Sequence, residues 1–148
     1  MILVQREDFD PGAELERLTA GRQDIGAVAS FIGLVRGEGV TAMTLEHYPG
    51  MTERQLARIE AEARSRWPVQ EITLIHRFGR LLPGERIVLV LVAAAHRGSA
   101  FQACEFLIDW LKTQAPFWKL EEGASGARWV EAKEDDVRKA AHWTAAKN

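Results

Sequence analysis

The sequence feature that most constrains the fold is an apolar run from Ile87 to Ala95, which no polar residue interrupts. A strand that is apolar at every position has both faces buried, so this run predicts a central strand of the main sheet. A second apolar segment, Ala27 to Val35, predicts another strand. Gly33 within it indicates a β-bulge or the close approach of a neighbouring backbone.

Two long amphipathic helices are expected, over Thr52–Arg66 and Ser99–Thr113. Each starts with the pattern of a capping box, a hydroxyl residue followed three positions later by glutamine. The two expected boxes are Thr52 with Gln55 and Ser99 with Gln102. Proline ends both helices, because the residue before a proline avoids helical backbone angles.

The remaining elements are shorter. Asp10 and Pro11 predict the start of a short helix that turns Leu15 and Leu18 toward the core and ends at Gly21. The tail from residue 133 is a short helix or frays. Further strands are expected over Ile2–Val4, Thr41–Tyr48, Glu71–Arg77, Phe117–Glu121 and Arg128–Glu131. This order of helices and strand pairs predicts an α+β fold with a mainly antiparallel sheet.

Composition excludes several classes of protein. The chain has 148 residues, the size of one domain, and its formal net charge of -2 argues against general nucleic-acid binding. The single cysteine, Cys104, excludes an intrachain disulfide and a cysteine-based zinc cluster. No apolar run is long enough to span a bilayer, and the N-terminus does not resemble a signal peptide. We therefore expect a cytoplasmic protein with no membrane association and no metal or other cofactor.

Basic residues stand at the ends of the apolar elements. They are Arg36, His76, Arg77, His96, Arg97, Lys112, Lys119 and Arg128. A strand that leads into a helix N-terminus favours bound anions, so His96 and Arg97 are candidates for an anion site. Each residue also has a simpler interpretation as a solvated strand or helix end, and Lys112 complements the helix dipole without any further role.

Other residues have a default structural interpretation. Cys104 falls on the buried face of its helix, so we expect a packed thiol. The aromatic residues Phe31, Phe101, Phe106 and Trp110 are expected in the core. The net charge conceals a proposed cluster of cations, with acidic residues such as Glu53, Glu60, Glu62, Asp135 and Asp136 placed elsewhere.

Seven segments together resemble the large, catalytic subunit of molybdopterin synthase. The most specific are Leu-Glu-His-Tyr-Pro-Gly-Met, residues 45–51, and Pro-Phe-Trp-Lys, residues 116–119. The others are Ser30–Arg36, Ile75–Gly79, Ala95–Arg97, Leu111–Thr113 and Arg128–Glu131. The segments run in the family's order from about residue 25 to residue 132. Residues 1–148 thus form one domain of this kind, with residues 1–24 and 133–148 matching only loosely.

The resemblance implies a fold and a reaction. The family fold is an α/β hammerhead with an additional antiparallel sheet. The family converts cyclic pyranopterin monophosphate to molybdopterin by transferring two sulfurs. Sulfur arrives as a thiocarboxylate on the C-terminal Gly-Gly tail of a small ubiquitin-like subunit. Two large subunits form a central homodimer, with one small subunit at each end of the heterotetramer.

The resemblance also implies roles for particular residues. Lys112 and Lys119 match the family's two essential lysines, so we expect them to be catalytic, and Lys119 also to bind substrate. The other implied substrate-binding residues are Leu34, Val35, Arg36, His96, Arg97, Leu120, Glu121 and Arg128. At position 120 a leucine replaces a residue that is often basic in relatives, and Arg128 acts within its own chain or across the dimer.

Two alternatives stay open on the sequence. A non-catalytic module would dock the ubiquitin-like Gly-Gly tail without an anion pocket. The presence of five basic residues at matching positions argues against such a module. A general anion or RNA binder is disfavoured by the net charge, and a steep dependence of RNA affinity on salt would support it.

Overall fold

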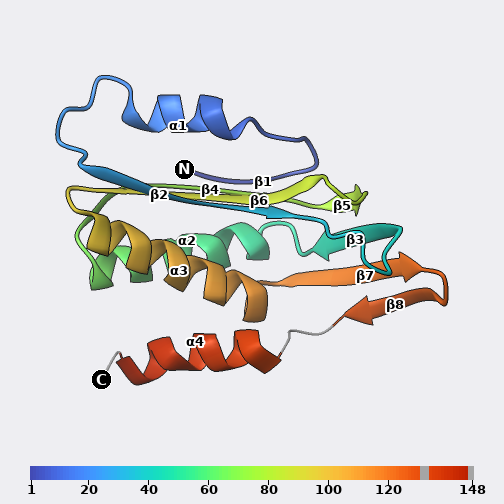
Figure 1. Ribbon diagram of the computed structural model, residues 1–148. Coiled ribbons are helices and arrows are strands. Elements are labelled where there is room, and N and C mark those ends of the chain that lie inside the picture. The colour runs from blue at the N-terminus through green and yellow to red at the C-terminus, as the bar shows by residue number, and fades with distance from the viewer. Residues whose placement is uncertain (131–133, 147–148) are drawn as a thin grey trace.

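The computed structural model describes residues 1–130 and 134–146 (Figure 1). Its elements are β1 (Ile2–Gln5), α1 (Pro11–Thr19), β2 (Ala27–Leu34), β3 (Ala42–His47), α2 (Met51–Arg66), β4 (Val69–Arg77), β5 (Gly79–Leu81), β6 (Arg86–Ala94), α3 (Arg97–Thr113), β7 (Phe117–Gly123), β8 (Gly126–Val130) and α4 (Glu134–Ala146). The α+β class is confirmed. Glu131, the expected end of the last strand, and residue 133 lie outside the described residues. Among the described residues, no helix combines the length and apolar character that a bilayer-spanning segment needs.

The main sheet has the strand order β1-β4-β6-β2. Only the β1–β4 pair is parallel, and the other pairs are antiparallel. Val90 of β6 has a register partner on each side, Phe31 of β2 and Leu74 of β4. The predicted central strand is therefore confirmed. Helices α2 and α3 cover one face of this sheet and α1 covers the other (Figure 1).

The two faces carry cores of different size. The larger core lies under α2 and α3 and includes Leu74, Val90 and Leu107. The smaller core lies on the α1 side and comprises Phe9, Ile75, Leu89 and Leu91, with Leu18 packed against them. Leu15 is 41% exposed, so its predicted core position is wrong. Phe9, from the loop before α1, and Leu18 fill this smaller core and leave Leu15 at its margin.

Phe106 and Trp110 are buried as predicted, whereas Phe101 is 63% exposed. Phe101 lies beside β2, which is an edge strand, so no further strand covers that side of α3. Cys104 is buried, and burial raises the pKa of its thiol to about 11. The prediction of a packed thiol is confirmed. The prediction for Phe101 is wrong because the sheet ends at β2.

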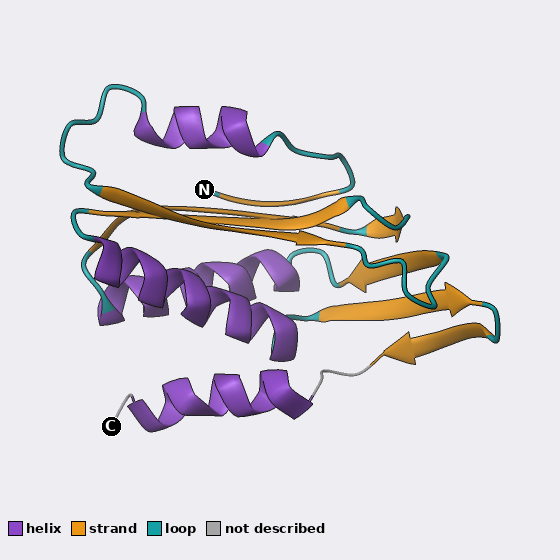
Figure 2. Cartoon of the chain, in the orientation of Figure 1, coloured by secondary structure: helices purple, strands orange, loops and turns teal. Residues whose placement is uncertain are grey.

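The second sheet has the order β5-β3-β7-β8 and is antiparallel throughout (Figure 2). Its own small core is made of Val35, Met43, Leu45 and Leu81. Strand β5 has only three residues, too few for an alternating pattern, so it could not be predicted from the sequence. This sheet extends beyond the C-terminal end of α3, and the β7–β8 hairpin projects from β3 (Figure 2).

Both long helices begin earlier than predicted. Helix α2 begins at Met51, and the carboxylate of Glu53 accepts a 2.6 Å hydrogen bond from the backbone N–H of Gly50. Thr52 is already helical, and its hydroxyl donates to the carbonyl of Tyr48. Helix α3 begins at Arg97, and its N-cap, His96, makes no side-chain capping bond. The predicted capping boxes at Thr52 and Ser99 are therefore wrong.

Candidate active site

Two adjoining cavities share Lys112 and Lys119 in their walls. The outer cavity, of about 350 Å³, is lined by six of the residues singled out from the sequence: Leu34, Arg36, Lys112, Lys119, Glu121 and Arg128. The inner chamber, of about 170 Å³, also includes Leu34 and both lysines in its wall. Lys112 belongs to α3 and Lys119 to β7, so the fold brings the two lysines to one site from either side of Pro116.

Strand alternation explains which residues of β7 and β8 line the outer cavity. Lys119 and Glu121 share one face of β7, and Leu120 points to the opposite face. On β8, Val130 is the register partner of Lys119, and Arg128 is the register partner of Glu121. The hairpin thus presents all four side chains to the cavity. The side chain of Leu120 faces away, so only its backbone is available to a ligand there.

The end of β2 supplies the opposite wall. The pairing of β2 with β6 shifts register between Gly33 and Leu34, which confirms the predicted bulge. A side chain at Gly33 would place its Cβ 2.7 Å from Cγ1 of Val88, so glycine permits this close approach. Beyond the bulge, Leu34 and Arg36 line the outer cavity, whereas Val35 is buried in the core of the second sheet.

The outer cavity carries mixed charge with an excess of cations. Four basic side chains line it, those of Arg36, Lys112, Lys119 and Arg128, together with three acidic ones, those of Glu38, Glu121 and Asp136. Asp136 was expected away from the cations, but α4 brings it to this rim. An excess of positive charge in a partly enclosed site favours an anionic ligand.

Apolar residues make up most of the wall of the inner chamber. Its apolar wall consists of Phe31, Leu34, Ile87, Val88, Ile108, Leu111, Phe117 and Val130. His76 also lines it, and sequence analysis gave this histidine no role. Alternation along β4 could have revealed its position from the sequence. It puts His76 on the same face as Ile72 and Leu74, which is the face under α2 and α3. Burial lowers the pKa of His76 to about 4, so the ring is neutral near pH 7.

His96 and Arg97 do not reach this site within one chain. They lie at the N-terminal end of α3, whereas Lys112 lies in its last turn (Figure 1). An α-helix rises 1.5 Å per residue, which puts about 22 Å between Arg97 and Lys112. Both His96 and Arg97 are exposed at the helix N-terminus, an environment that favours an anion.

Arg77, another basic residue at a strand end, has a structural role. Its guanidinium is buried and donates to the backbone carbonyls of Arg6 and Arg86, each at 3.0 Å. It also lies 3.5 Å from a carboxylate oxygen of Glu85. These bonds tie the segment after β1 to the start of β6.

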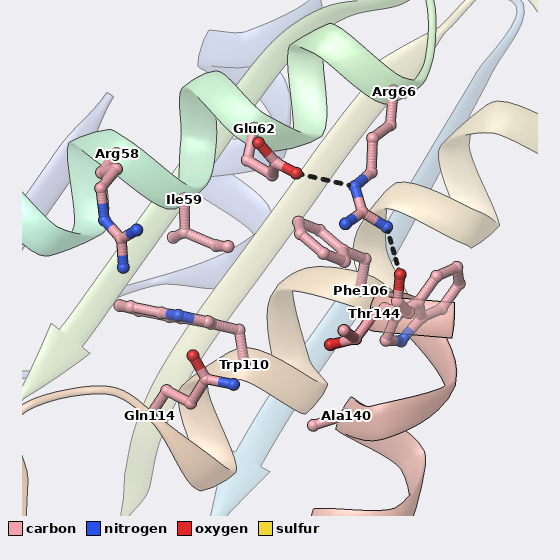
Figure 3. A pocket seen from close by; sticks show the side chains of 10 residues that line it. Arg58, Ile59, Glu62, Arg66, Phe106, Trp110, Gln114, Ala140 and Thr144 are labelled. Atoms are coloured by element: carbon pink, nitrogen blue, oxygen red, sulfur yellow. Dashed lines mark hydrogen bonds and ion pairs between the residues drawn. The ribbon is translucent and has the colours of Figure 1, made fainter. Parts of the chain in front are cut away.

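A third hollow, between α2, α3 and α4, contains none of the predicted site residues (Figure 3). Aromatic and basic side chains line it, and hydrogen bonds made by two of these side chains hold α4 to the domain. The indole N–H of Trp143 donates to the carboxylate of Asp109 at 2.7 Å, and Arg66 donates to the carbonyl of Trp143 at 3.0 Å. The guanidinium of Arg66 also stacks over the ring of Phe106. We assign this hollow to packing.

Among the described residues, no group of three or more histidine, cysteine, aspartate or glutamate side chains is arranged to hold a metal ion. Lys112 and Lys119 supply positive charge and proton donors to the site. Comparison with known proteins identifies the family of the chain. The model of the MoaE protein family matches residues 4–114.

The chain belongs to the MoaE protein family. One curated relative, the molybdopterin synthase catalytic subunit of Ralstonia nicotianae, is 58% identical over 96% of this chain and 83% of its own length. The solved MoaE protein of Burkholderia ambifaria is 51% identical, with a TM-score of 0.83 over 97% of each chain. Molybdopterin synthase from Staphylococcus aureus is 32% identical, with a TM-score of 0.77 over 86% of this chain and 95% of that one. The MoaE family assignment confirms the resemblance seen in the sequence.

Proposed function

We propose that the chain is the catalytic subunit of a molybdopterin synthase, a sulfurtransferase. It converts cyclic pyranopterin monophosphate to molybdopterin with two sulfurs from the C-terminal thiocarboxylate of a small ubiquitin-like subunit. The observation that carries the proposal is the meeting of Lys112 and Lys119 where the outer cavity joins the inner chamber. A curated relative with this name is 58% identical to the chain.

The two hollows suit two anionic reactants. A thiocarboxylate and a phosphate both require cations held in a partly dry site. The inner chamber is the smaller of the two and apolar residues make up most of its wall, so it suits the terminal glycines of the partner's tail. The outer cavity is larger and contains Arg36 and Arg128, so it suits the phosphate-bearing pterin. Lys112 and Lys119, which both hollows share, are placed where sulfur passes between the reactants.

Each transfer takes place in two steps. The thiocarboxylate sulfur forms a bond to a substrate carbon as a carbon–oxygen bond at that carbon breaks. The oxygen leaves with the opened phosphate in one transfer and as water in the other. The product is a thioester that joins the partner's tail to the pterin. Water then cleaves the acyl–sulfur bond, leaving sulfur on the pterin and a carboxylate on the tail. Negative charge develops on the acyl oxygen, and the ammonium group of Lys112 stabilises it. Lys119 binds the substrate and moves protons as the cyclic phosphate opens and water leaves.

We also propose that two copies form the central dimer of a heterotetramer. The support is the separation along α3 between the lysines and the cationic pair of His96 and Arg97. A second copy related by a two-fold axis would bring this pair toward the first copy's cavity and add cations for the phosphate. We place the assembly in the cytoplasm because the relatives are bacterial proteins and because the sequence contains no long apolar run.

Reconstitution with the small subunit tests the proposed function. The wild-type chain, mixed with the thiocarboxylated partner and the cyclic precursor, is expected to form molybdopterin in a single turnover. Lys112→Ala is expected to lower the rate by about 10²–10³-fold, the usual effect of removing one oxyanion-stabilising group. Lys139→Ala, which removes an exposed lysine of α4, serves as the matched control. Normal sulfur transfer by Lys112→Ala would contradict the assignment.

The alternative function is a non-catalytic module that docks the Gly-Gly tail. The cations of the outer cavity disfavour it, because docking a tail in the inner chamber makes no use of Arg36 or Arg128. The same reconstitution separates the two functions. A docking module would bind the partner and leave the pterin precursor unchanged.

A further inference from the structure

His76 is a motif residue that the proposed reaction does not use. It is the penultimate residue of β4, with Val88 of β6 and Val4 of β1 as its register partners. The side chain is only 7% exposed and lines the inner chamber beside the two lysines. Helix α3 ends before reaching this point of the sheet, so the first residue of β7, Phe117, covers the histidine instead.

Two contacts fix the orientation and the tautomer of the His76 ring. The ring stacks on Phe117 with a centroid separation of 3.9 Å and an angle of 16° between the planes. Its Nδ1 lies 2.8 Å from the carbonyl oxygen of Arg77. A carbonyl oxygen only accepts hydrogen bonds, so Nδ1 carries the proton. In the neutral ring Nε2 is then an acceptor.

A second motif histidine contacts the same phenylalanine. The ring of His47, on β3, lies 4.4 Å from Phe78 and 5.9 Å from Phe117. Its Nδ1 lies 2.9 Å from the hydroxyl of Thr52, and that hydroxyl donates its own proton to Tyr48. His47 therefore donates to Thr52. Both histidines hold the start of β7, and of the two only His76 lines the chamber.

The link to the chemistry is Lys119. Phe117 and Lys119 are two residues apart on one strand, so they share a face, and the contact of His76 with Phe117 sets the position of Lys119 over the chamber. The charged groups that face His76 are Lys119 from β7, His47 from β3 and Lys112 from α3. The first two disfavour protonation of the ring, in addition to the larger effect of burial.

We propose that His76 is a positioning residue for Lys119. Its stack on Phe117 holds β7 in place, and its neutral ring keeps an acceptor, Nε2, in the chamber without a competing positive charge. The proposal rests on the proposed sulfur transfer and deepens it. A charged residue at position 76 would repel the ammonium of Lys119. The neutral histidine lets Lys119 keep its proton for substrate binding and acid catalysis.

Three variants test this in the reconstituted complex of the full chain with its thiocarboxylated partner. His76→Phe keeps an aromatic ring against Phe117 but removes both nitrogens. The stack on Phe117 remains, so only the loss of the acceptor nitrogen is tested. We expect kcat to fall about tenfold on the alkaline side of its pH profile, with KM for the pterin within about twofold. The alkaline limb of the kcat profile should move about one pH unit lower, because the Lys119 ammonium loses a neighbouring acceptor.

His76→Gln restores an amide donor and acceptor without the ring, so we expect it to return the alkaline limb toward its wild-type position. His47→Phe is the matched control. It removes the nitrogens of the histidine that does not line the chamber, so the limb should stay in place. A role in folding alone would lower the amount of active protein in all three variants and shift no limb.

A measurement that does not depend on activity supports or overturns the geometry. Nitrogen-15 NMR of the histidine side chains should show His76 neutral, with the proton on Nδ1, down to about pH 5. A ring protonated at that pH, or an unshifted limb in His76→Phe with kcat unchanged, would overturn the proposal. If His76→Phe does not fold, two results still test the proposal. They are the protonation state of His76 by NMR and the position of the alkaline limb in His76→Gln. Absence of turnover in the wild-type complex would instead refute the proposed function.

Discussion

At the scale of single residues, His76 makes stability depend on pH. The unfolded ring binds a proton near pH 6.5, whereas the folded ring does so only near pH 4. Between these values the unfolded state holds more protons, so the free energy of unfolding falls as the pH drops from about 6.5 to about 4. The full loss is about 3 kcal/mol, from 1.36 kcal/mol per pKa unit.

Urea denaturation of the wild type and of His76→Phe at pH 7 and pH 4.5 measures this contribution. The phenylalanine variant lacks the ring that titrates, so its stability should fall less between the two pH values. The carboxylates titrate in both proteins, and their contribution cancels in the comparison. Equal pH dependence in the two proteins would contradict the low pKa of the buried histidine.

The candidate site could be predicted only in part from its residues. Local patterns predicted the bulge at Gly33 and the buried thiol of Cys104, because both depend on a few neighbours in the chain. The predicted strand over residues 117–121 already puts Leu120 on the face opposite to Lys119, but the family resemblance named site residues by motif position and not by face. The resemblance also grouped His96 and Arg97 with the lysines, and motif positions do not tell residues of one copy from residues of a second copy.

At the scale of elements, α4 is held to the domain through Trp143. Trp143→Phe keeps most of the ring contacts but leaves the buried carboxylate of Asp109 without its indole partner. We expect the free energy of unfolding to fall by about 1–3 kcal/mol, the usual cost of an unsatisfied buried group. Urea denaturation followed by circular dichroism measures it.

Trp129→Phe is the matched control for that experiment. Trp129 lies on β8 and is 62% exposed, so its replacement should change stability by less than about 0.5 kcal/mol. If the two variants were equally stable, the bond between Trp143 and Asp109 would not be what anchors α4.

The sequence predicts well which segments with a long periodic pattern form helices or strands. It predicts poorly the residue at which each helix begins. The apolar run of β6 and the stripes of α2 and α3 depend on burial, which sequence shows directly. Helix starts depend on which of several polar residues adopts the capping conformation. Gly50 and His96 took that place instead of Thr52 and Ser99, because the preceding chain already turns there.

At the scale of the whole molecule, the proposed dimer predicts complementation between two inactive variants. Lys112→Ala lacks the lysine that we propose to be catalytic, and Arg97→Ala lacks the arginine that we propose to bind the phosphate from the other end of α3. If each site takes Lys112 from one copy and Arg97 from the other, a mixed dimer contains one intact site. Random mixing should then restore about one quarter of the wild-type activity in the reconstitution assay.

The two variants should be mixed under conditions in which subunits exchange, and each alone serves as the control. Recovery well above the sum of the separate activities supports a shared site. Activity that stays at that sum, with exchange shown by mass-tagged chains, would place each site within one copy and contradict the shared arrangement.

The register of the second sheet has a consequence for how the enzyme matures. Lys119 pairs with Leu45, a residue far earlier in the chain, while Lys112 belongs to a helix that packs on the main sheet. Contacts between distant parts of a chain form slowly, since the intervening segment must first be ordered. We therefore expect the two lysines to meet late in folding. A nascent or partly unfolded chain would expose each lysine without the other, and the reactive tail of the partner would find no enclosed site on it.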